Sequence, residues 1–268
     1  MKRIIVASAL ALATALPLAA FADTQLTAVG STALLPLVKQ SATDYAGKHG
    51  DVKIDVSGGG SYVGIAQASS GAADLGDSDV VAAGNSGLVD HKVAVVAFAI
   101  AANPSAGVTN LSAKQIRDIF AGRVTNWKQV GGKDQAIVVI NRPRTSGTRA
   151  VFKSTIMGVS QIAEGLTEDS SGAVTTMVAT TPGAVTYVAL GYTKDKPLSV
   201  LKIGGIAPTV QNIQTGKYPI WSYEHIFTKG KAKPEAEQFI NFVAHNDETL
   251  WKLGYIPVHT MKVHEDNR

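Results

Sequence analysis

Short apolar runs alternate with amphipathic segments along most of the chain, which is the pattern of an α/β protein. The most apolar run, at 92–101, predicts a strand that is buried on both faces of a sheet. At 234–245 the pattern predicts a helix, because Pro234 suits a first turn and apolar residues recur along one side. In all, we expect strands at 25–29, 52–56, 74–79, 92–101, 136–141, 183–190 and 198–203, and helices at 33–46, 62–69, 112–120, 149–156, 174–179 and 234–245.

The composition is that of a globular protein, with 45% hydrophobic and 17% charged residues among 268, and it includes no cysteine. The missing cysteine excludes disulfides, thiol nucleophiles and cysteine-ligated metals. The length permits two domains. No break in composition separates them, which favours a domain whose chain leaves and later returns.

The first 22 residues have the three parts of a secretory signal peptide. Lys2 and Arg3 precede an apolar run at 4–19, and Ala-Phe-Ala follows at 20–22. A retained membrane anchor is the alternative, but the run is shorter than the ~20 residues of a spanning helix. No cysteine follows for lipid attachment. We expect cleavage before Asp23, which leaves 246 residues, and export to a Gram-negative periplasm.

Export also changes the charge. Losing Lys2 and Arg3 lowers the formal net charge from +4 to +2. A nearly neutral mature chain gives no reason to expect nucleic acid or another polyanion as a partner.

Three segments share one design, in which a strand leads through a short turn of Ser, Thr and Gly into a helix. They are 30–33, 60–62 and 146–148. Each helix start presents unpaired backbone N–H groups and the positive end of a helix dipole, which suit an oxyanion. A plain N-cap is the alternative for each turn taken singly. Three such turns in one chain favour an anion site.

Arg142 lies four residues before the third of these turns. A guanidinium offers a fixed fork of donors that matches the oxygens of a tetrahedral anion. The alternative is a surface loop with solvated arginines.

Asp77-Ser78-Asp79 follows an apolar strand and brings carboxylates toward this anion site. A carboxylate repels an anion unless the anion has a proton to donate, as HPO4²⁻ and H2PO4⁻ have and sulfate has not. A buried carboxylate would therefore select phosphate over sulfate, and a nearby arginine would keep it ionised. For Asp77 itself we favour the alternative of a helix N-cap or a surface turn.

Over essentially the whole mature chain, these segments occur in the order seen in one family. The chain resembles the periplasmic phosphate-binding proteins of phosphate ABC transporters, in their shorter form. The resemblance implies a two-lobed type 2 periplasmic binding fold, in which each lobe is a sheet flanked by helices and two strands form the hinge. The matching segments are 30–36, 58–67, 74–80, 111–132, 142–148, 182–187, 218–220 and 254–257.

The resemblance also implies a role for individual residues. Asp79 would accept the proton of the phosphate, and Arg142 would be the charged donor and hold Asp79. Arg149, where longer relatives have smaller residues, would add charge at the cleft mouth. The remaining implied contacts are the hydroxyl and N–H of Thr32, the N–H of Ala33, the hydroxyl of Ser61 and the donor turn Ser146, Gly147 and Thr148, with Ser31 and Ser78 as extra contacts.

By the same resemblance, lobe one comprises 23–97 and 222–268, and lobe two comprises 98–221. The expected ligand is inorganic phosphate, held without a cofactor or a metal ion. The expected partner is the membrane permease of a phosphate ABC transporter, and we expect a monomer.

Other functions compete with this interpretation. An enzyme is disfavoured, because the chain has no G-x-S-x-G and no H-E-x-x-H, and the S-x-x-K at 199–202 lacks its partner motifs. The same fold could serve as an exported sensor, adhesion or surface module. It could also take another oxyanion: the Asp79 argument opposes sulfate, but arsenate carries a proton as phosphate does and stays open.

Overall fold

The structure, a computed structural model, describes residues 24–263. The predicted signal peptide at 1–22 and its cleavage before Asp23 lie outside the described residues. The α-helices are α1 (Leu35–Ala46), α2 (Ser61–Ser70), α3 (Ala113–Phe120), α4 (Gly147–Phe152), α5 (Ser171–Thr180), α6 (Val210–Gln214), α7 (Pro234–His245) and α8 (Asp247–Leu253). The strands are β1 (Thr24–Gly30), β2 (Val52–Ser57), β3 (Leu75–Ser78), β4 (Leu88–Ala102), β5 (Asn110–Leu111), β6 (Val138–Asn141), β7 (Leu166–Thr167), β8 (Ala184–Ala189), β9 (Ser199–Val200), β10 (Lys202–Ile203) and β11 (Trp221–Lys229).

Nine of these strands form one continuous sheet. Their order is β2-β1-β3-β11-β4-β8-β6-β7, with β9 beside β4, while β5 and β10 form a separate pair. β1 is parallel to β2 and β3, whereas β11 is antiparallel to both β3 and β4. β4 and β8 are antiparallel, and β6 is parallel to β8 and β7.

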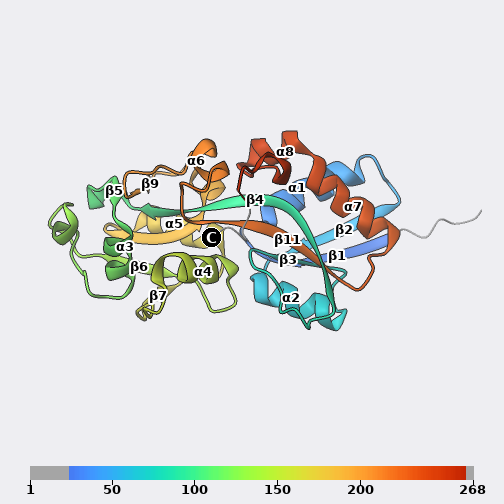
Figure 1. The fold of residues 1–268 in the computed structure, drawn as a ribbon, viewed down its shortest axis with the longest axis horizontal. Coiled ribbons are helices and arrows are strands. Elements are labelled where there is room, and N and C mark those ends of the chain that lie inside the picture. Colours follow the sequence, from blue (N-terminus) through green and yellow to red (C-terminus); the bar gives the residue numbers. More distant parts are fainter. Residues whose placement is uncertain (1–23, 264–268) are drawn as a thin grey trace, which may run out of the picture.

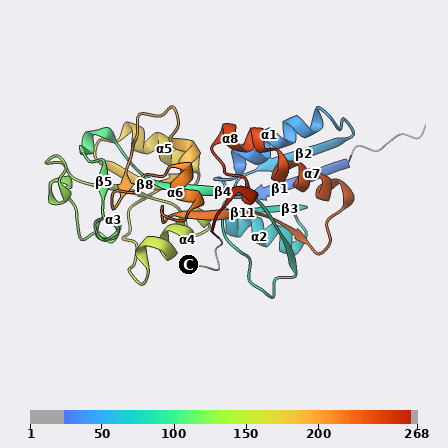
Figure 2. The same ribbon diagram turned by 45° about the horizontal axis from the view of Figure 1, so that its top comes forward.

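The helices and strands are arranged in two lobes (Figure 1). In lobe one, α1, α2, α7 and α8 lie with β1, β2 and β3; in lobe two, α3 to α6 lie with β6 and β8, and the turned view shows the same division (Figure 2). β4 runs through both: it pairs with β11 as far as Ala97 and with β8 from Phe98 onward. The expected two-lobed α/β architecture is confirmed.

Aromatic side chains pack helices against one another in lobe one and against the sheet in lobe two. In lobe one, Tyr45 of α1 packs edge-on against Phe239 of α7, with ring centroids 5.5 Å apart. In lobe two, Phe152 at the end of α4 stacks on Tyr187 of β8 at 4.2 Å. Burying one such side chain stabilises the fold by about 1.5–3 kcal/mol. The end of α4 is therefore packed against the sheet.

Three predicted helices and strands differ clearly from the structure. The helix expected at 174–179 begins earlier, at Ser171. The helix expected at 149–156 begins earlier, at Gly147, and continues from Lys153 to Met157 as a π-helix. The strand expected at 198–203 is two short strands, because β9 pairs with β4 whereas β10 pairs with β5.

β11 and α8 were absent from the prediction. β11 reads WSYEHIFTK, and every residue but the last is buried. Polar residues therefore interrupt its apolar pattern on both faces, and neither a helical nor an alternating period results. Of the helices within 24–263, none combines the length and apolar character that a membrane span requires.

Candidate anion-binding site

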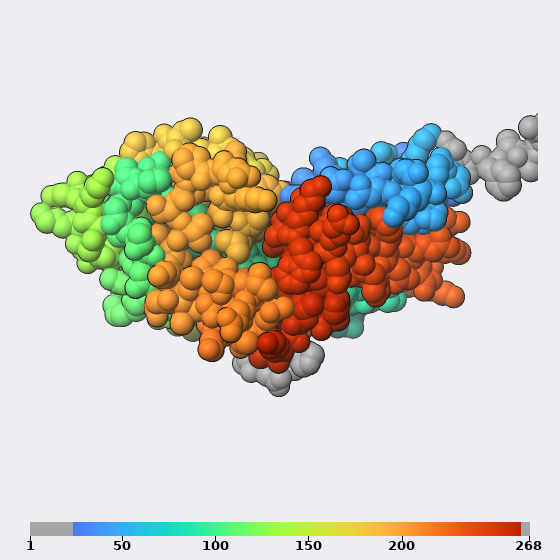
Figure 3. Space-filling view, turned by 90° about the horizontal axis from the view of Figure 1, so that it is seen from above, coloured from blue at the N-terminus to red at the C-terminus, as the bar shows by residue number. Residues whose placement is uncertain are grey.

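Turns that precede four helices meet where the lobes join. In lobe one these turns precede α1 and α2, and in lobe two they precede α4 and α5. The backbone N–H of Tyr62 donates to the carbonyl of Thr145 across the junction, at 3.2 Å. From outside, the surface is notched between α5 of lobe two and α1 and α8 of lobe one (Figure 3). Three of these turns are the predicted ones.

The Asp79 carboxylate is 1% exposed and accepts hydrogen bonds from both lobes. Ser31 Oγ of lobe one donates to Oδ1, and Thr148 Oγ1 of lobe two donates to Oδ2 at 2.7 Å. The backbone N–H of Asp79 donates to Ser61 Oγ at 2.9 Å. The structure therefore brings together Ser31, Ser61, Asp79 and Thr148, which are far apart in the sequence.

The Arg142 guanidinium is equally buried and is fixed by lobe two. Nε donates to the carbonyl of Glu168 at 3.0 Å, and Nη2 donates to that of Asp169 at 3.1 Å. Nη2 also reaches Thr32 Oγ1 of lobe one, at 2.9 Å. The side-chain hydrogen bonds of Arg142 go to groups other than Asp79, although the charge of Asp79 acts on the guanidinium. That Arg142 holds Asp79 stays a prediction.

The donor turn of lobe two contributes in two ways. Ser146 caps α4, since its Oγ accepts the backbone N–H of Arg149 at 3.2 Å, which agrees with the N-cap alternative for that hydroxyl. Thr148 instead directs its hydroxyl to lobe one.

Ala33, an expected contact, and Ser78, an expected extra contact, make hydrogen bonds near their own positions in the chain. The N–H of Ala33 donates to Ser31 Oγ at 3.0 Å, and so stays within its own turn. Ser78 Oγ donates to the carbonyl of Val80 at 2.6 Å. In this arrangement Ser78 contributes nothing to the contact between the lobes.

Two glycines allow the lobes to approach this closely. A Cβ at Gly147 would lie 2.2 Å from Ser61 Oγ and 2.9 Å from the Asp79 Cβ. A Cβ at Gly60, where φ is +97°, would lie 2.5 Å from the carbonyl oxygen of Thr145. Any larger residue at either position would push the two lobes apart.

Two further residues, which the sequence analysis did not single out, contact the site. Ser171 Oγ lies 3.2 Å from both Thr32 Oγ1 and Arg142 Nη1, and the Tyr192 hydroxyl donates to the carbonyl of Thr32 at 2.7 Å. Burial raises the pKa of Tyr192 to about 12, so its proton is retained. Ser170 caps α5, and Ser171 and Gly172 begin its first turn. This segment has the same design as the three predicted turns, so that signal was present in the sequence. No motif around Tyr192 in the sequence indicates that this residue contacts the site.

Charged groups are few and buried at this site. Burial lowers the pKa of Arg142 from its usual value, while the charge of Asp79 acts in the opposite direction; a guanidinium stays protonated nevertheless. Burial, and then the charge of Asp79, raise the pKa of Glu224 in β11 well above its usual range. This favours the neutral form of Glu224, which adds no second negative charge beside Asp79.

Asp77 is neither a helix N-cap nor part of a surface turn, so that expectation was wrong. It lies within β3, between Gly30 of β1 and Ile226 of β11, because the strand continues to Ser78. Its side chain is fully buried, and among the described residues neither carboxyl oxygen has a hydrogen-bond partner. Burial, and to a lesser extent the charge of Asp79, raise the pKa of Asp77 to about 8.

This burial predicts a pH-dependent stability. Between about pH 4 and pH 8 the folded protein keeps a proton on Asp77 that the unfolded chain releases, so stability falls as pH rises, by about 1.4 kcal/mol per unit. Asp77→Asn removes the titrating carboxyl group, so the variant should not lose this stability as pH rises. We expect urea denaturation to show an advantage of the variant over wild type that grows from pH 4 to pH 8. Exposed Asp134→Asn is the control, and an advantage of Asp77→Asn that is constant with pH would contradict the assignment.

Known proteins share this architecture. The model of the PBP superfamily domain matches residues 18–247, so the chain belongs to the PBP superfamily. The phosphate-binding protein PstS of Bacillus subtilis is 44% identical to it over 91% of this chain and 84% of the relative. Within the superfamily, the chain belongs to the family of PstS phosphate-binding proteins.

Solved structures agree with this assignment. A phosphate ABC transporter substrate-binding protein from Clostridium perfringens, solved with bound phosphate, superposes with a TM-score of 0.84 at 27% identity, covering 88% of this chain and all of that one. An ABC-type phosphate transport receptor from Vibrio cholerae has a TM-score of 0.71 at 30% identity, covering 86% of this chain and 99% of that one.

Proposed function

We propose that this protein captures inorganic phosphate between its two lobes and delivers it to the membrane permease of a phosphate ABC transporter. One observation carries the proposal: a buried carboxylate, Asp79, and a buried guanidinium, Arg142, meet among hydroxyls that come from both lobes. A carboxylate and a guanidinium at one spot suit an anion that also has a proton to donate.

Two of the bonds between the lobes, from Arg142 to Thr32 and from Thr148 to Asp79, would have counterparts in such a complex. Arg142 Nη2, which donates to Thr32, would donate to a phosphate oxygen. Asp79, which accepts the Thr148 hydroxyl, would accept the phosphate proton, and Thr148 and Ser61 would turn their hydroxyls to the anion. The N–H groups of Thr32 and Ala33 and the turn 146–148 would complete the shell.

The strength of these bonds is sufficient for tight binding. A hydrogen bond that involves a charged group contributes about 1.5–3 kcal/mol net. Several of them, after the costs of desolvation and closure, reach the ~8 kcal/mol of micromolar affinity. Water is excluded when the lobes close.

The hinge follows from the pairing of two strands. We assign 23–97 and 222–268 to lobe one and 98–221 to lobe two. The exchange of β4 partners at Ala97 and Phe98, and the start of β11 at Trp221 opposite Ala97, support these bounds. Rotation about β4 and β11 would open the site.

Delivery to a permease requires a location outside the cytoplasm, and the predicted signal peptide provides it. We expect the mature protein to act there as a monomer. It would need neither a metal ion nor a cofactor, and it would carry out no reaction.

Phosphate uptake by intact cells tests this role. Cells that lack the protein should take up phosphate poorly at micromolar concentrations and recover when the wild-type chain is supplied, but not when Arg142→Ala is supplied. Uptake that is unaffected by loss of the protein, with phosphate still bound by the purified chain, would instead favour a sensor or surface role.

Closure itself gives a further prediction. In Gly147→Ala, the new methyl group would meet Ser61 and Asp79 of the other lobe, and we expect phosphate affinity to fall at least about tenfold. Unfolding temperature should change little, because alanine favours a helix. Gly84→Ala, where a Cβ meets nothing within 4 Å, is the matched control. Unchanged affinity in Gly147→Ala would show that phosphate does not need the closed arrangement.

A further inference from the structure

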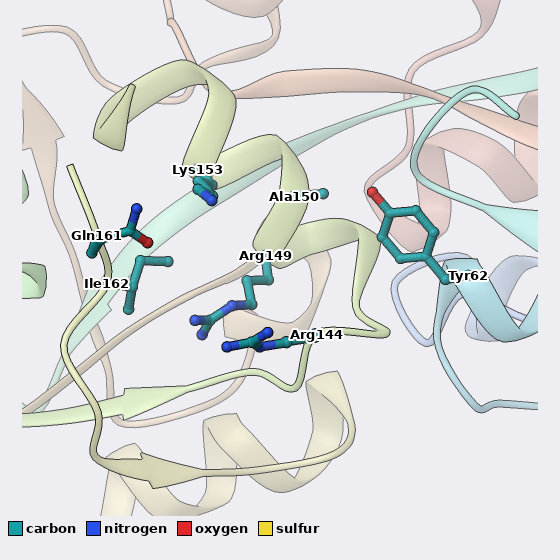
Figure 4. Close-up of a pocket in the computed structure, with 7 residues that line it drawn as sticks. All are labelled: Tyr62, Arg144, Arg149, Ala150, Lys153, Gln161 and Ile162. Atoms are coloured by element: carbon teal, nitrogen blue, oxygen red, sulfur yellow. The ribbon is translucent and has the colours of Figure 1, made fainter. Parts of the chain in front are cut away.

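A cavity of about 300 Å³ opens beside the site, and three of the seven residues that line it are cationic. Figure 4 shows the guanidinium groups of Arg144 and Arg149 side by side, with Lys153 above them and Tyr62 across from them on the other lobe. None of the lining residues is acidic. The full lining is Tyr62, Arg144, Arg149, Ala150, Lys153, Gln161 and Ile162.

Arg149 is held in this position. Its Nη1 donates to the carbonyl of Arg142 at 3.0 Å and lies 3.4 Å from the Tyr187 hydroxyl. Arg144 and Lys153 are exposed and stand on either side of it in the chain. Like charges gathered on one surface repel each other, and an anion among them relieves that repulsion. The cluster is therefore suited to attract an oxyanion.

The cavity adjoins the proposed phosphate site. Tyr62 follows Ser61, and Arg149 follows Thr148, so two lining residues are the chain neighbours of two residues of the inner site. Arg149 also touches the backbone of Arg142. An anion that leaves this cavity toward the protein interior would meet the inner donors next.

We propose that the cavity at Arg144, Arg149 and Lys153 is an outer anion site, which takes inorganic phosphate from solution before it enters the inner site. This inference rests on the proposed function. Because the mature chain is nearly neutral, attraction of the anion depends on a local positive field, and such fields raise association rates.

The outer site differs from the inner one in its selectivity. Its lining residues include no carboxylate, so the outer site lacks the group that would accept the proton of phosphate and repel sulfate. Sulfate should occupy it as readily as phosphate. Its cations are partly open to solvent, so occupancy should weaken as salt is added.

Stopped-flow kinetics tests the outer site. Phosphate association with the full mature chain can be followed by tryptophan fluorescence, since Trp221 lies at the start of β11 in the hinge. In Arg144→Ala/Lys153→Ala we expect the association rate constant to fall at least about threefold at low salt, and the difference to vanish at high salt. The control is Lys202→Ala/Lys217→Ala, which removes the same charge from exposed positions of lobe two outside the cavity. It should change the association rate constant little.

Competition by sulfate is a second test of the outer site. At equal ionic strength, sulfate should slow phosphate association with the wild type more than chloride does, and this effect should be lost in Arg144→Ala/Lys153→Ala. An unchanged association rate and no sulfate effect, with phosphate still bound, would overturn the outer site and leave the proposed function standing. A wild type that binds no phosphate would overturn both.

Discussion

Replacing Arg142 by alanine should weaken phosphate binding by about 2–5 kcal/mol, which is about 30-fold to several thousand-fold in Kd. The side chain is buried, and it is the guanidinium that joins the two lobes at the site. Its loss removes the charged donor and leaves the Asp79 carboxylate to repel the anion alone. Calorimetric titration with phosphate measures the effect.

Two comparisons make this result specific. Arg142→Lys keeps the charge but not the fork of donors, so its affinity should fall between those of wild type and Arg142→Ala. Arg123→Ala, which loses only an exposed ion pair with Asp118, should bind phosphate as the wild type does. Thermal unfolding of each variant distinguishes lost binding from lost folding. A folded Arg142→Ala protein with affinity within twofold of wild type would exclude Arg142 from the site.

Asp79→Asn should reduce the preference for phosphate over sulfate by about 100-fold or more. In the wild type, the carboxylate accepts the phosphate proton and repels a sulfate oxygen. The amide of asparagine has a similar shape but can donate a hydrogen bond to sulfate. Phosphate affinity should therefore fall while sulfate affinity rises, as measured by competition of the two anions in one titration.

The control for this substitution is Asp134→Asn, which makes the same change at an exposed position of lobe two. It should leave both affinities as they are. If Asp79→Asn keeps the wild-type preference, the proton of phosphate is recognised by another group, and Glu224, the buried acid beside Asp79, becomes the first candidate.

The local design of the site could be predicted from the sequence. A Ser/Thr/Gly turn between a strand and a helix depends on residues that are close in the chain. Thr32 lies in such a turn in the structure, and Ser61 and Thr148 lie in the first turns of α2 and α4. Arg142 was found in the same way, from its distance to one turn. Ser171 carries the same signal, because it follows the N-cap Ser170 at the start of α5.

Contacts between distant segments could not be predicted in this way. The partners of Asp79 come from 31 and 148, and its neighbour Glu224 comes from a strand, β11, whose buried polar residues conceal its pattern. Asp77 was misjudged for a related reason, since an unpartnered buried carboxyl is costly and a surface position is the ordinary expectation. The pairing of Arg142 with Thr32 rather than Asp79 depends on how the lobes meet.

Calorimetry of the purified wild-type chain with phosphate and then with sulfate tests the central claim most directly. At high salt, which screens the outer site, we expect one phosphate to bind per chain with micromolar affinity or better. Under the same conditions, sulfate should give no heat of binding and should leave the phosphate titration unchanged. Equal affinity for the two anions would contradict the role of Asp79, and no binding of either would contradict the site as a whole.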